Sequence, residues 1–285
     1  LIYMYGGSAI LSALILIYII SDEGNSTIKL SWVVPILVFP VFGTLFYLFL
    51  TLQPGTHRIN RRIEEVGTKL RPYLLQDPEV LAHYESISAS GGNLVRYMNQ
   101  YGRFPAYENT GARYFPLGDD MFPVLLEELK KAEHFIFMEY FIVEHGVMWD
   151  AILQVLETKA AEGVEVRFMY DGMGNLFTLP HGYEKAMQEK GIQCKIFAPV
   201  RPALSSYQNN RDHRKICVID GHTAFTGGVN LADEYINQRV RFGHWKDTAV
   251  LIKGKAVDSF TMMFLQLWDV TERDGEEYRR FLCPP

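Results

Sequence analysis

The sequence has little of what disulfide, metal or nucleic-acid chemistry requires. Its three cysteines, Cys194, Cys217 and Cys283, show neither metal-ligand spacing nor a pairing pattern, so we interpret them as reduced thiols. Outside one motif described below, the histidines also lack metal-ligand spacing. The formal net charge is −5, whereas duplex binding depends on clustered Lys and Arg. These absences indicate no metal site and disfavour a nucleic-acid partner.

A secretory signal is also missing, although the chain has two long apolar runs. Leu1–Ile20 and Trp32–Leu52 lack a basic start and a small-residue cleavage site. Each is about long enough to span hydrocarbon at ~1.5 Å per residue, and the polar joint SDEGNSTIKLS between them predicts a helical hairpin. Because the chain opens with leucine rather than methionine, we expect it to be part of a longer protein.

Charges around the two runs predict their orientation in a membrane. The joint carries Asp22, Glu23 and a single Lys29, whereas three arginines follow the second run directly: Arg58, Arg61 and Arg62. Basic residues stay on the cytoplasmic side, where they also gain from anionic headgroups. We therefore expect the remainder of the chain to lie in the cytosol against the inner leaflet.

After a helical, partly irregular connector, the pattern from residue 111 onward becomes α/β. Apolar strand-like runs alternate with amphipathic helical segments, which predicts a largely parallel or mixed sheet flanked by helices. The expected strands are HFIFMEYFIV, VEVRFMYD, QCKIFAP, HRKICVID, TAFTGGV and DTAVLIKG; the expected helices are PVLLEELKKAE, Met148–Glu162, HGYEKAMQEKG and Ala256–Thr271.

His213 and Lys215 stand two residues apart in the run HRKICVID. Alternate side chains of a strand face the same way, so these two should project together while Arg214 faces the other side. An imidazole can attack phosphorus or transfer a proton, and an ammonium can neutralise phosphate oxygens. The spacing therefore favours a site in which both groups act on one phosphate.

The segment after this run should return close to the histidine. Asp220-Gly221 suits a turn, and the next strand ends in Gly227, Gly228 and, two residues on, Asn230. Glycine lets a ligand approach the backbone closely, and an asparagine amide can donate to a phosphate oxygen. We expect these three residues to bind substrate.

The motif H-R-K-I-C-V-I-D followed by G-G-V-N resembles the H-x-K-x4-D…G-G-x-N signature of the phospholipase D superfamily. With the hairpin, PLGDDMFPVLLEELKKAEHFIFMEYFI, NLADEYI and HWKDTAVLIKG, nearly the whole chain is similar to bacterial cardiolipin synthases of that superfamily. The resemblance implies three parts: a transmembrane helical hairpin in residues 1–53, a juxtamembrane connector in residues 54–110 and a phospholipase-D-like catalytic half-domain in residues 111–285.

The resemblance also implies a reaction and a location. His213 would be the nucleophile or its proton-transferring counterpart, forming a phosphohistidine with one phosphatidylglycerol and releasing glycerol, after which a second phosphatidylglycerol attacks to give cardiolipin. Lys215 and Asn230 would hold the phosphate oxygens, with no metal or other cofactor. The protein would sit in the bacterial inner membrane, with its catalytic domain in the cytoplasm and anionic lipid as its partner.

Two aspartates compete to orient His213. Asp220 belongs to the motif, but it lies seven residues away at the far end of the strand, so we interpret it as mainly structural while retaining it as a catalytic candidate. Asp247 in HWKDT resembles better the acidic residue that related enzymes place behind the histidine. There it would accept the Nδ1 proton and leave Nε2 free.

Two acidic residues at strand ends have more than one interpretation. Glu139 interrupts an apolar strand, where a lone carboxylate is costly to bury; it lies either in the substrate pocket, in an ion pair or at an exposed strand end. Asp171 ends another strand, where ligands gather in α/β sheets, and a plain turn or helix cap is the alternative.

A second H-x-K-x4-D does not follow His213 in this sequence, although the superfamily builds one site from two such motifs. The second half therefore comes from downstream sequence or from a second copy in a homodimer; otherwise the chain is catalytically silent. Another phosphatidyltransferase, a membrane-tethered phosphodiesterase and a non-enzymatic membrane interaction module stay open beside the synthase.

Overall fold

The computed structural model describes residues 2–51, 54–108, 110–200, 211–272 and 277–283. The chain forms two compact units. Among the described residues, the first comprises 2–51 and 54–58, and the second comprises the remainder, from Ile59 onward.

Three helices make up the described part of the first unit: α1 (Ile2–Ser21), α2 (Ser26–Val38) and α3 (Pro40–Thr51). A small apolar cluster joins them, with Ile15, Ile19, Ile36 and Tyr47 buried. The hydroxyl oxygens of Ser12 and Thr44 lie 2.7 Å apart between α1 and α3. Many of the other large apolar side chains of these helices are exposed.

The second apolar run does not form one helix, so the two-helix prediction is wrong there. Phe39 leaves the helical region with φ −128° and ψ 74°, because the proline that follows disfavours a helical conformation at the residue before it. The run folds back on itself at this point: Trp32 of α2 packs against Tyr47 of α3, with ring centroids 5.4 Å apart. Within the described residues, no helix combines the length and the apolarity needed to cross a membrane.

Helices fill most of the connector, as its spacing predicted. They are α4 (Pro54–Leu70), the 3-10 turn Arg71–Tyr73, α5 (Pro78–Ile87), α6 (Ala89–Tyr97) and the π-helical turn Met98–Gly102. Val66 and Leu70 of α4 are buried among side chains of the second unit, which joins this end of the connector to the α/β part of the chain.

The second unit contains a seven-stranded mixed sheet in the order β1-β7-β6-β5-β2-β3-β4. β2, β3 and β4 are parallel, whereas β5 runs antiparallel to β2 and is followed by antiparallel β6, β7 and β1. The strands are β1 (Thr110–Phe115), β2 (Phe135–Tyr140), β3 (Glu165–Asp171), β4 (Gln193–Phe197), β5 (Ile216–Ile219), β6 (Thr223–Gly227) and β7 (Ala249–Gly254). This arrangement confirms the predicted mixed sheet and adds β1.

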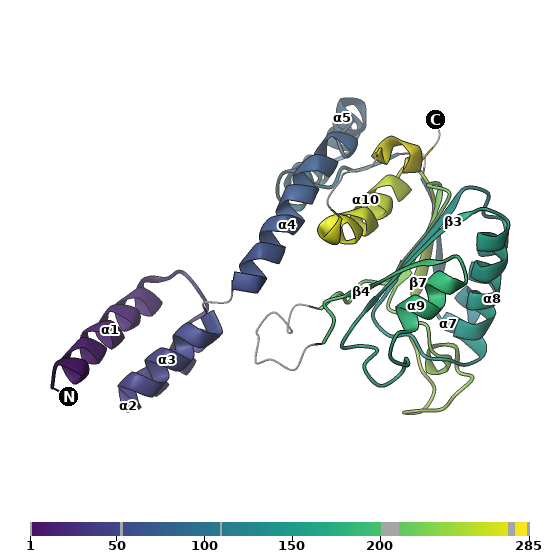
Figure 1. Ribbon diagram of the computed structural model, residues 1–285. Helices are drawn as coiled ribbons and strands as arrows, with labels where there is room; N and C mark the ends of the chain where they lie inside the picture. The colour runs from purple at the N-terminus through teal and green to yellow at the C-terminus, as the bar shows by residue number, and fades with distance from the viewer. Residues whose placement is uncertain (1, 52–53, 109, 201–210, 273–276, 284–285) are drawn as a thin grey trace. The chain divides into compact units, whose positions relative to one another are not determined.

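Helices cover both faces of this sheet. α7 (Gly118–Lys130), α8 (Val147–Ala161) and α9 (Tyr183–Glu189) pack on one face, and α10 (Val257–Trp268) packs on the other. Figure 1 shows the sheet between these two layers. Alternation divides β2, β3, β5 and β6 between two apolar clusters, one on each face.

One edge of the sheet collects the ends that carry the motif. Glu139, near the end of β2, is the register partner of Ile216 at the start of β5. Gly227, the last residue of β6, likewise pairs with Ala249 at the start of β7. The segments that follow β2, β3 and β6 and those that precede β5 and β7 therefore meet at this edge, hereafter the motif edge.

Candidate active site

His213 and Lys215 lie at the motif edge in extended chain just before β5. The exposed His213 ring stands above the buried Lys215 side chain. Lys215 Nζ lies 3.3 Å from His213 Nδ1 and donates to the His213 carbonyl oxygen at 2.7 Å. Phe141, directly after β2, packs its ring 4.5 Å from the His213 ring, centroid to centroid. The imidazole and the amine therefore face the same small volume.

The Lys215 amine is largely buried, and burial lowers its pKa to about 8 from 10.5. The negative charges of Asp212, Asp247 and Asp171 oppose that shift. An amine of this kind carries most of its positive charge at neutral pH. It can therefore attract an anion, and its exchange between charged and neutral forms falls close to physiological pH.

Arg214 projects away from this pair, as alternation predicted, and binds Glu139. Arg214 Nε lies 2.6 Å from Glu139 Oε1 and 3.2 Å from Asp212 Oδ1. Glu139 is completely buried, and that burial raises the pKa of its carboxyl well above the ordinary value. Of the three interpretations of Glu139, the structure shows the ion pair, which holds the strand β2 to the H-x-K segment.

Asp171 fixes the chain before His213. Its Oδ1 accepts from the backbone N–H groups of Met173 at 2.8 Å and Gly174 at 3.0 Å, and its Oδ2 accepts from Asp212 N at 3.1 Å. The structure thus places Asp171 in a turn that also anchors the residue next to His213.

Asn230 is buried and fastens two segments of the motif edge. Its Oδ1 accepts from Ile142 N at 3.0 Å and its Nδ2 donates to the Tyr235 hydroxyl at 2.8 Å. One of its two N–H bonds is used in this way, and binding of a phosphate oxygen by the second stays a prediction. Nothing in the sequence indicated that Asn230 fastens these two segments.

The two glycines make room for protein atoms. A Cβ at Gly227, where φ is +150°, would lie 2.3 Å from the Thr248 carbonyl oxygen, and a Cβ at Gly228 would lie 2.0 Å from Asp247 Oδ1. Protein atoms therefore account for the absence of a side chain at both glycines, and the expected close approach of a ligand stays a prediction. Gly228 allows the Asp247 carboxylate to lie against the backbone.

Asp247 sits beside β7 with its carboxylate toward the motif. Its Oδ1 accepts from Thr248 N at 2.8 Å, and its charge acts on Lys215. Among the contacts described, His213 Nδ1 faces the Lys215 amine rather than this carboxylate. The hydrogen bond that the resemblance implies between His213 and Asp247 is not formed in this arrangement.

Asp220 lies at the other end of β5 and holds backbone. Its Oδ2 accepts from Glu133 N and its Oδ1 from His134 N and Phe135 N, each at 2.8 Å. The residue adopts a positive φ of 50° in the turn after β5. It therefore organises the start of β2, away from His213.

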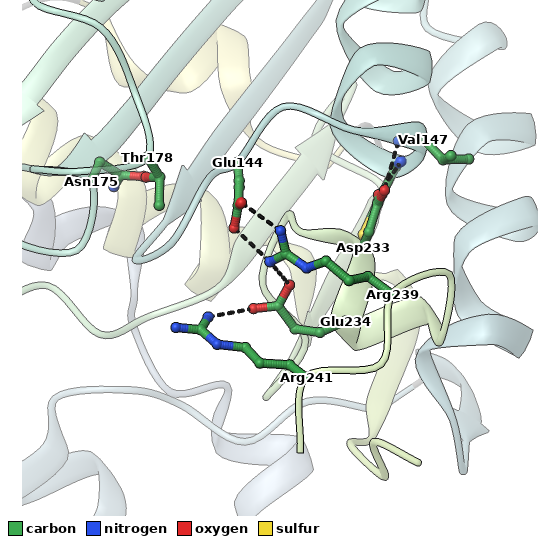
Figure 2. A network of polar contacts seen from close by, with 9 residues as sticks. Glu144, Val147, Asn175, Thr178, Asp233, Glu234, Arg239 and Arg241 are labelled. Atoms are coloured by element: carbon green, nitrogen blue, oxygen red, sulfur yellow. Dashed lines mark hydrogen bonds and ion pairs between the residues drawn. The ribbon is translucent and has the colours of Figure 1, made fainter. Parts of the chain in front are cut away.

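A polar network beside the site was not predicted from the sequence. Glu234 is 1% exposed and pairs with Arg239 and Arg241, and Arg239 also pairs with Glu144 (Figure 2). Asp233, the neighbour of Glu234, accepts from the first backbone N–H groups of α8. The acidic pair in NLADEYI was the only sign of this network in the sequence.

Comparison with known proteins identifies the family. A family model described as "Cardiolipin synthase, PLD-like domain" matches residues 125–268, and one described as "Phospholipase_D-nuclease N-terminal" matches residues 10–50. The chain belongs to the phospholipase D superfamily, as a cardiolipin-synthase-like protein with this N-terminal segment and one such domain.

Individual relatives agree with that assignment. An uncharacterized protein of Streptococcus mutans is 46% identical over 260 residues, covering 91% of this chain and 56% of the relative. Cardiolipin synthases of Alkalihalophilus pseudofirmus and Geobacillus thermodenitrificans are each 33% identical, over 94% and 96% of this chain and 54% and 55% of theirs. The chain spans about half the length of these relatives.

Among solved structures, the Nuc protein of Salmonella typhimurium, described as a phospholipase D family member, is 20% identical. It aligns with a TM-score of 0.42 over 56% of this chain and 94% of its own.

Proposed function

We propose that this chain is the membrane-associated first half of a cardiolipin synthase. In that reaction, a phosphatidyl group passes from one phosphatidylglycerol to another through a phosphohistidine, and glycerol is released. The proposal is carried by the contact of 3.3 Å between His213 Nδ1 and Lys215 Nζ at the motif edge, together with the family and its named relatives.

His213 Nε2 attacks phosphorus in the first step. The bond between phosphorus and the headgroup glycerol oxygen breaks, and the leaving glycerol takes a proton from an acid. In the second step the hydroxyl of another phosphatidylglycerol gives up its proton and attacks phosphorus, the phosphorus–nitrogen bond breaks, and cardiolipin forms. Lys215 and the second N–H bond of Asn230 stabilise the negative oxygens in both steps.

Binding of a phosphate changes the contact between Lys215 and His213. The ammonium now next to Nδ1 is drawn toward the phosphate oxygens, because they carry the larger negative charge. The imidazole can then adopt the tautomer in which Nδ1 carries the proton and donates a hydrogen bond to Asp247, which leaves Nε2 unprotonated and nucleophilic. We assign Asp220 no part in these steps, since its carboxylate binds three backbone N–H groups.

The acid that protonates the leaving glycerol is supplied by a second H-x-K half, from downstream sequence or from a second copy. The relatives are about twice as long as the matched region, which favours downstream sequence. Exposed apolar side chains on α1, α2 and α3 support a position at the bacterial inner membrane, with the second unit in the cytoplasm and phosphatidylglycerol as substrate.

The test uses the full-length protein in phosphatidylglycerol vesicles, with cardiolipin and released glycerol both measured. We expect His213→Ala to abolish both products, and we expect His222→Ala, at the opposite end of β5, to retain them. Undiminished synthesis by His213→Ala would contradict the proposal. Offering water and other alcohols as acceptors separates a synthase from a phosphodiesterase or another phosphatidyltransferase, because only the acceptor differs between them.

A further inference from the structure

One loop at the motif edge pairs its two arginines with carboxylates of the folded unit and exposes two of its apolar side chains. In the segment 238–246, hereafter the arginine loop, Val240 and Phe242 are each 79% exposed. The alternating Arg239 and Arg241 instead reach back to carboxylates of the folded unit. A loop surrounded by water gains free energy from the reverse arrangement, because exposed apolar surface is unfavourable there.

Specific contacts hold the arginines in this orientation. Arg239 donates to both carboxylate oxygens of Glu144, at 2.6 and 2.7 Å, and to Glu234 Oε2 at 2.6 Å. Arg241 donates to Glu234 Oε1 at 2.9 Å. Figure 2 shows both guanidinium groups directed at these two carboxylates. Both arginines are bound to Glu234, which is almost fully buried. Because side chains alternate along this segment, these contacts keep Val240 and Phe242 directed outward.

A second loop, residues 172–180, exposes another aromatic ring at the same edge. This segment contains no charged residue, and Phe177 is 93% exposed, with Met173 and Leu176 partly so at 41% and 38%. Asn175 anchors it from within: its Nδ2 donates to the carbonyl oxygens of Phe141 and Asp171, each at 2.8 Å. We call this segment the phenylalanine loop.

A short segment after β2 connects both loops to the reactive histidine. Phe141 packs on the His213 ring and its carbonyl accepts from the phenylalanine loop. Three residues on, Glu144 binds the arginine loop. The two exposed rings therefore flank the edge from which a phosphate must reach His213.

We propose that the arginine loop and the phenylalanine loop insert Phe242 and Phe177 into the interface of an anionic lipid bilayer, delivering the motif edge to its substrate. The proposal rests on the proposed function and names the surface that serves it. Aromatic rings interleaved with basic side chains are favoured at the headgroup level. Arg239 and Arg241 are paired with Glu144 and Glu234, so the exposed Lys246 of the arginine loop is the charge that complements anionic phosphates.

The test measures the contact of each loop with lipid directly. Phe242→Cys and Phe177→Cys are made in the full-length protein with Cys283→Ser, because Cys194 and Cys217 are buried. Each cysteine is labelled with a polarity-sensitive fluorophore, and the protein is reconstituted in vesicles of phosphatidylcholine and phosphatidylglycerol with or without brominated acyl chains. Glu189→Cys, an exposed position at the end of α9, is the matched control.

We expect brominated lipid to quench the labels at 242 and 177 several-fold more than the label at 189, with a blue shift at both loop positions. A blue shift without bromine quenching would show that a protein surface covers the loops, and would overturn the proposal. Labels that stay as exposed to water as the control would also overturn it. The readout does not depend on turnover, so failure of the synthase assignment is distinguishable from failure of this contact.

Discussion

At the scale of single residues, the buried amine of Lys215 is the most unusual group in the site. Its folded pKa of about 8 lies below the ordinary value of 10.5 because burial penalises the ammonium. The unfolded chain therefore binds the proton more tightly than the folded one. This lowers the free energy of unfolding below about pH 8, and the penalty disappears as the pH rises from about 8 to 10.5.

Replacing this amine should increase stability and abolish activity. We expect Lys215→Met to raise the free energy of unfolding at neutral pH by up to about 3 kcal/mol, the equivalent of the pKa shift, while abolishing phosphatidyl transfer. In the unsubstituted protein, kcat/KM should fall as the pH rises through about 8, because the amine loses the charge that binds phosphate. Denaturant unfolding and a pH–rate profile measure the two effects; a rate that keeps rising above pH 9 contradicts this role.

Removal of Asp220 should lower stability, whereas removal of Asp247 should lower activity. Asp220→Ala leaves three backbone N–H groups without their acceptor, so we expect a loss of about 2–3 kcal/mol in the free energy of unfolding with activity per folded molecule retained. Asp247→Ala should do the opposite, lowering the turnover rate with little effect on stability. Thermal unfolding and vesicle assays on both variants check this; a normal melting temperature with lost activity in Asp220→Ala would return that residue to the catalytic set.

At the scale of elements, the ion pair between Arg214 and Glu139 joins β2 to the segment before β5. Arg214 opposes the rise in pKa that burial causes in the Glu139 carboxyl, so removing the arginine leaves a buried carboxyl group without its charged partner, which is destabilising. We expect Arg214→Met to lower the free energy of unfolding by about 3 kcal/mol, and Glu139→Gln combined with it to recover most of that loss. Denaturant unfolding of the single and double variants measures the coupling, and additive effects would show that the pair is not coupled.

The elements also show what a sequence can and cannot reveal. The six predicted strands could be recognised in the sequence because buried apolar runs mark them. That His213 and Lys215 face the same way followed from the alternation of side chains along an extended chain. β1, with four successive exposed residues in TGARYF, carries no such signal. The break that Pro40 imposes between two helices was not predicted, because the second run is apolar throughout. The contacts of Asn230 with Ile142 and of Arg239 with Glu144 join residues 88 and 95 positions apart, so only the folded structure could reveal them.

At the scale of the whole molecule, the chain holds one H-x-K-x4-D motif and spans about half the length of its relatives. If the second half lies downstream in the same polypeptide, each molecule contains a complete site. We therefore expect the rate of cardiolipin formation by the full-length protein to rise in proportion to its concentration at fixed lipid. A rate that rises with the square of the concentration would instead indicate that two copies share a site. Activity across a dilution series in phosphatidylglycerol vesicles distinguishes these cases.

The carboxylates of Asp220 and Asp233 have a consequence for how the protein is made. Three backbone N–H groups at the start of β2 donate to the Asp220 carboxylate, which lies 85 to 87 positions later in the chain. Two at the start of α8 donate to the Asp233 carboxylate, 85 or 86 positions later. During synthesis, β2 and α8 leave the ribosome with these amides bound only to water. Contacts between residues so far apart in the chain slow folding, so the second unit can complete its fold only after most of its chain has left the ribosome.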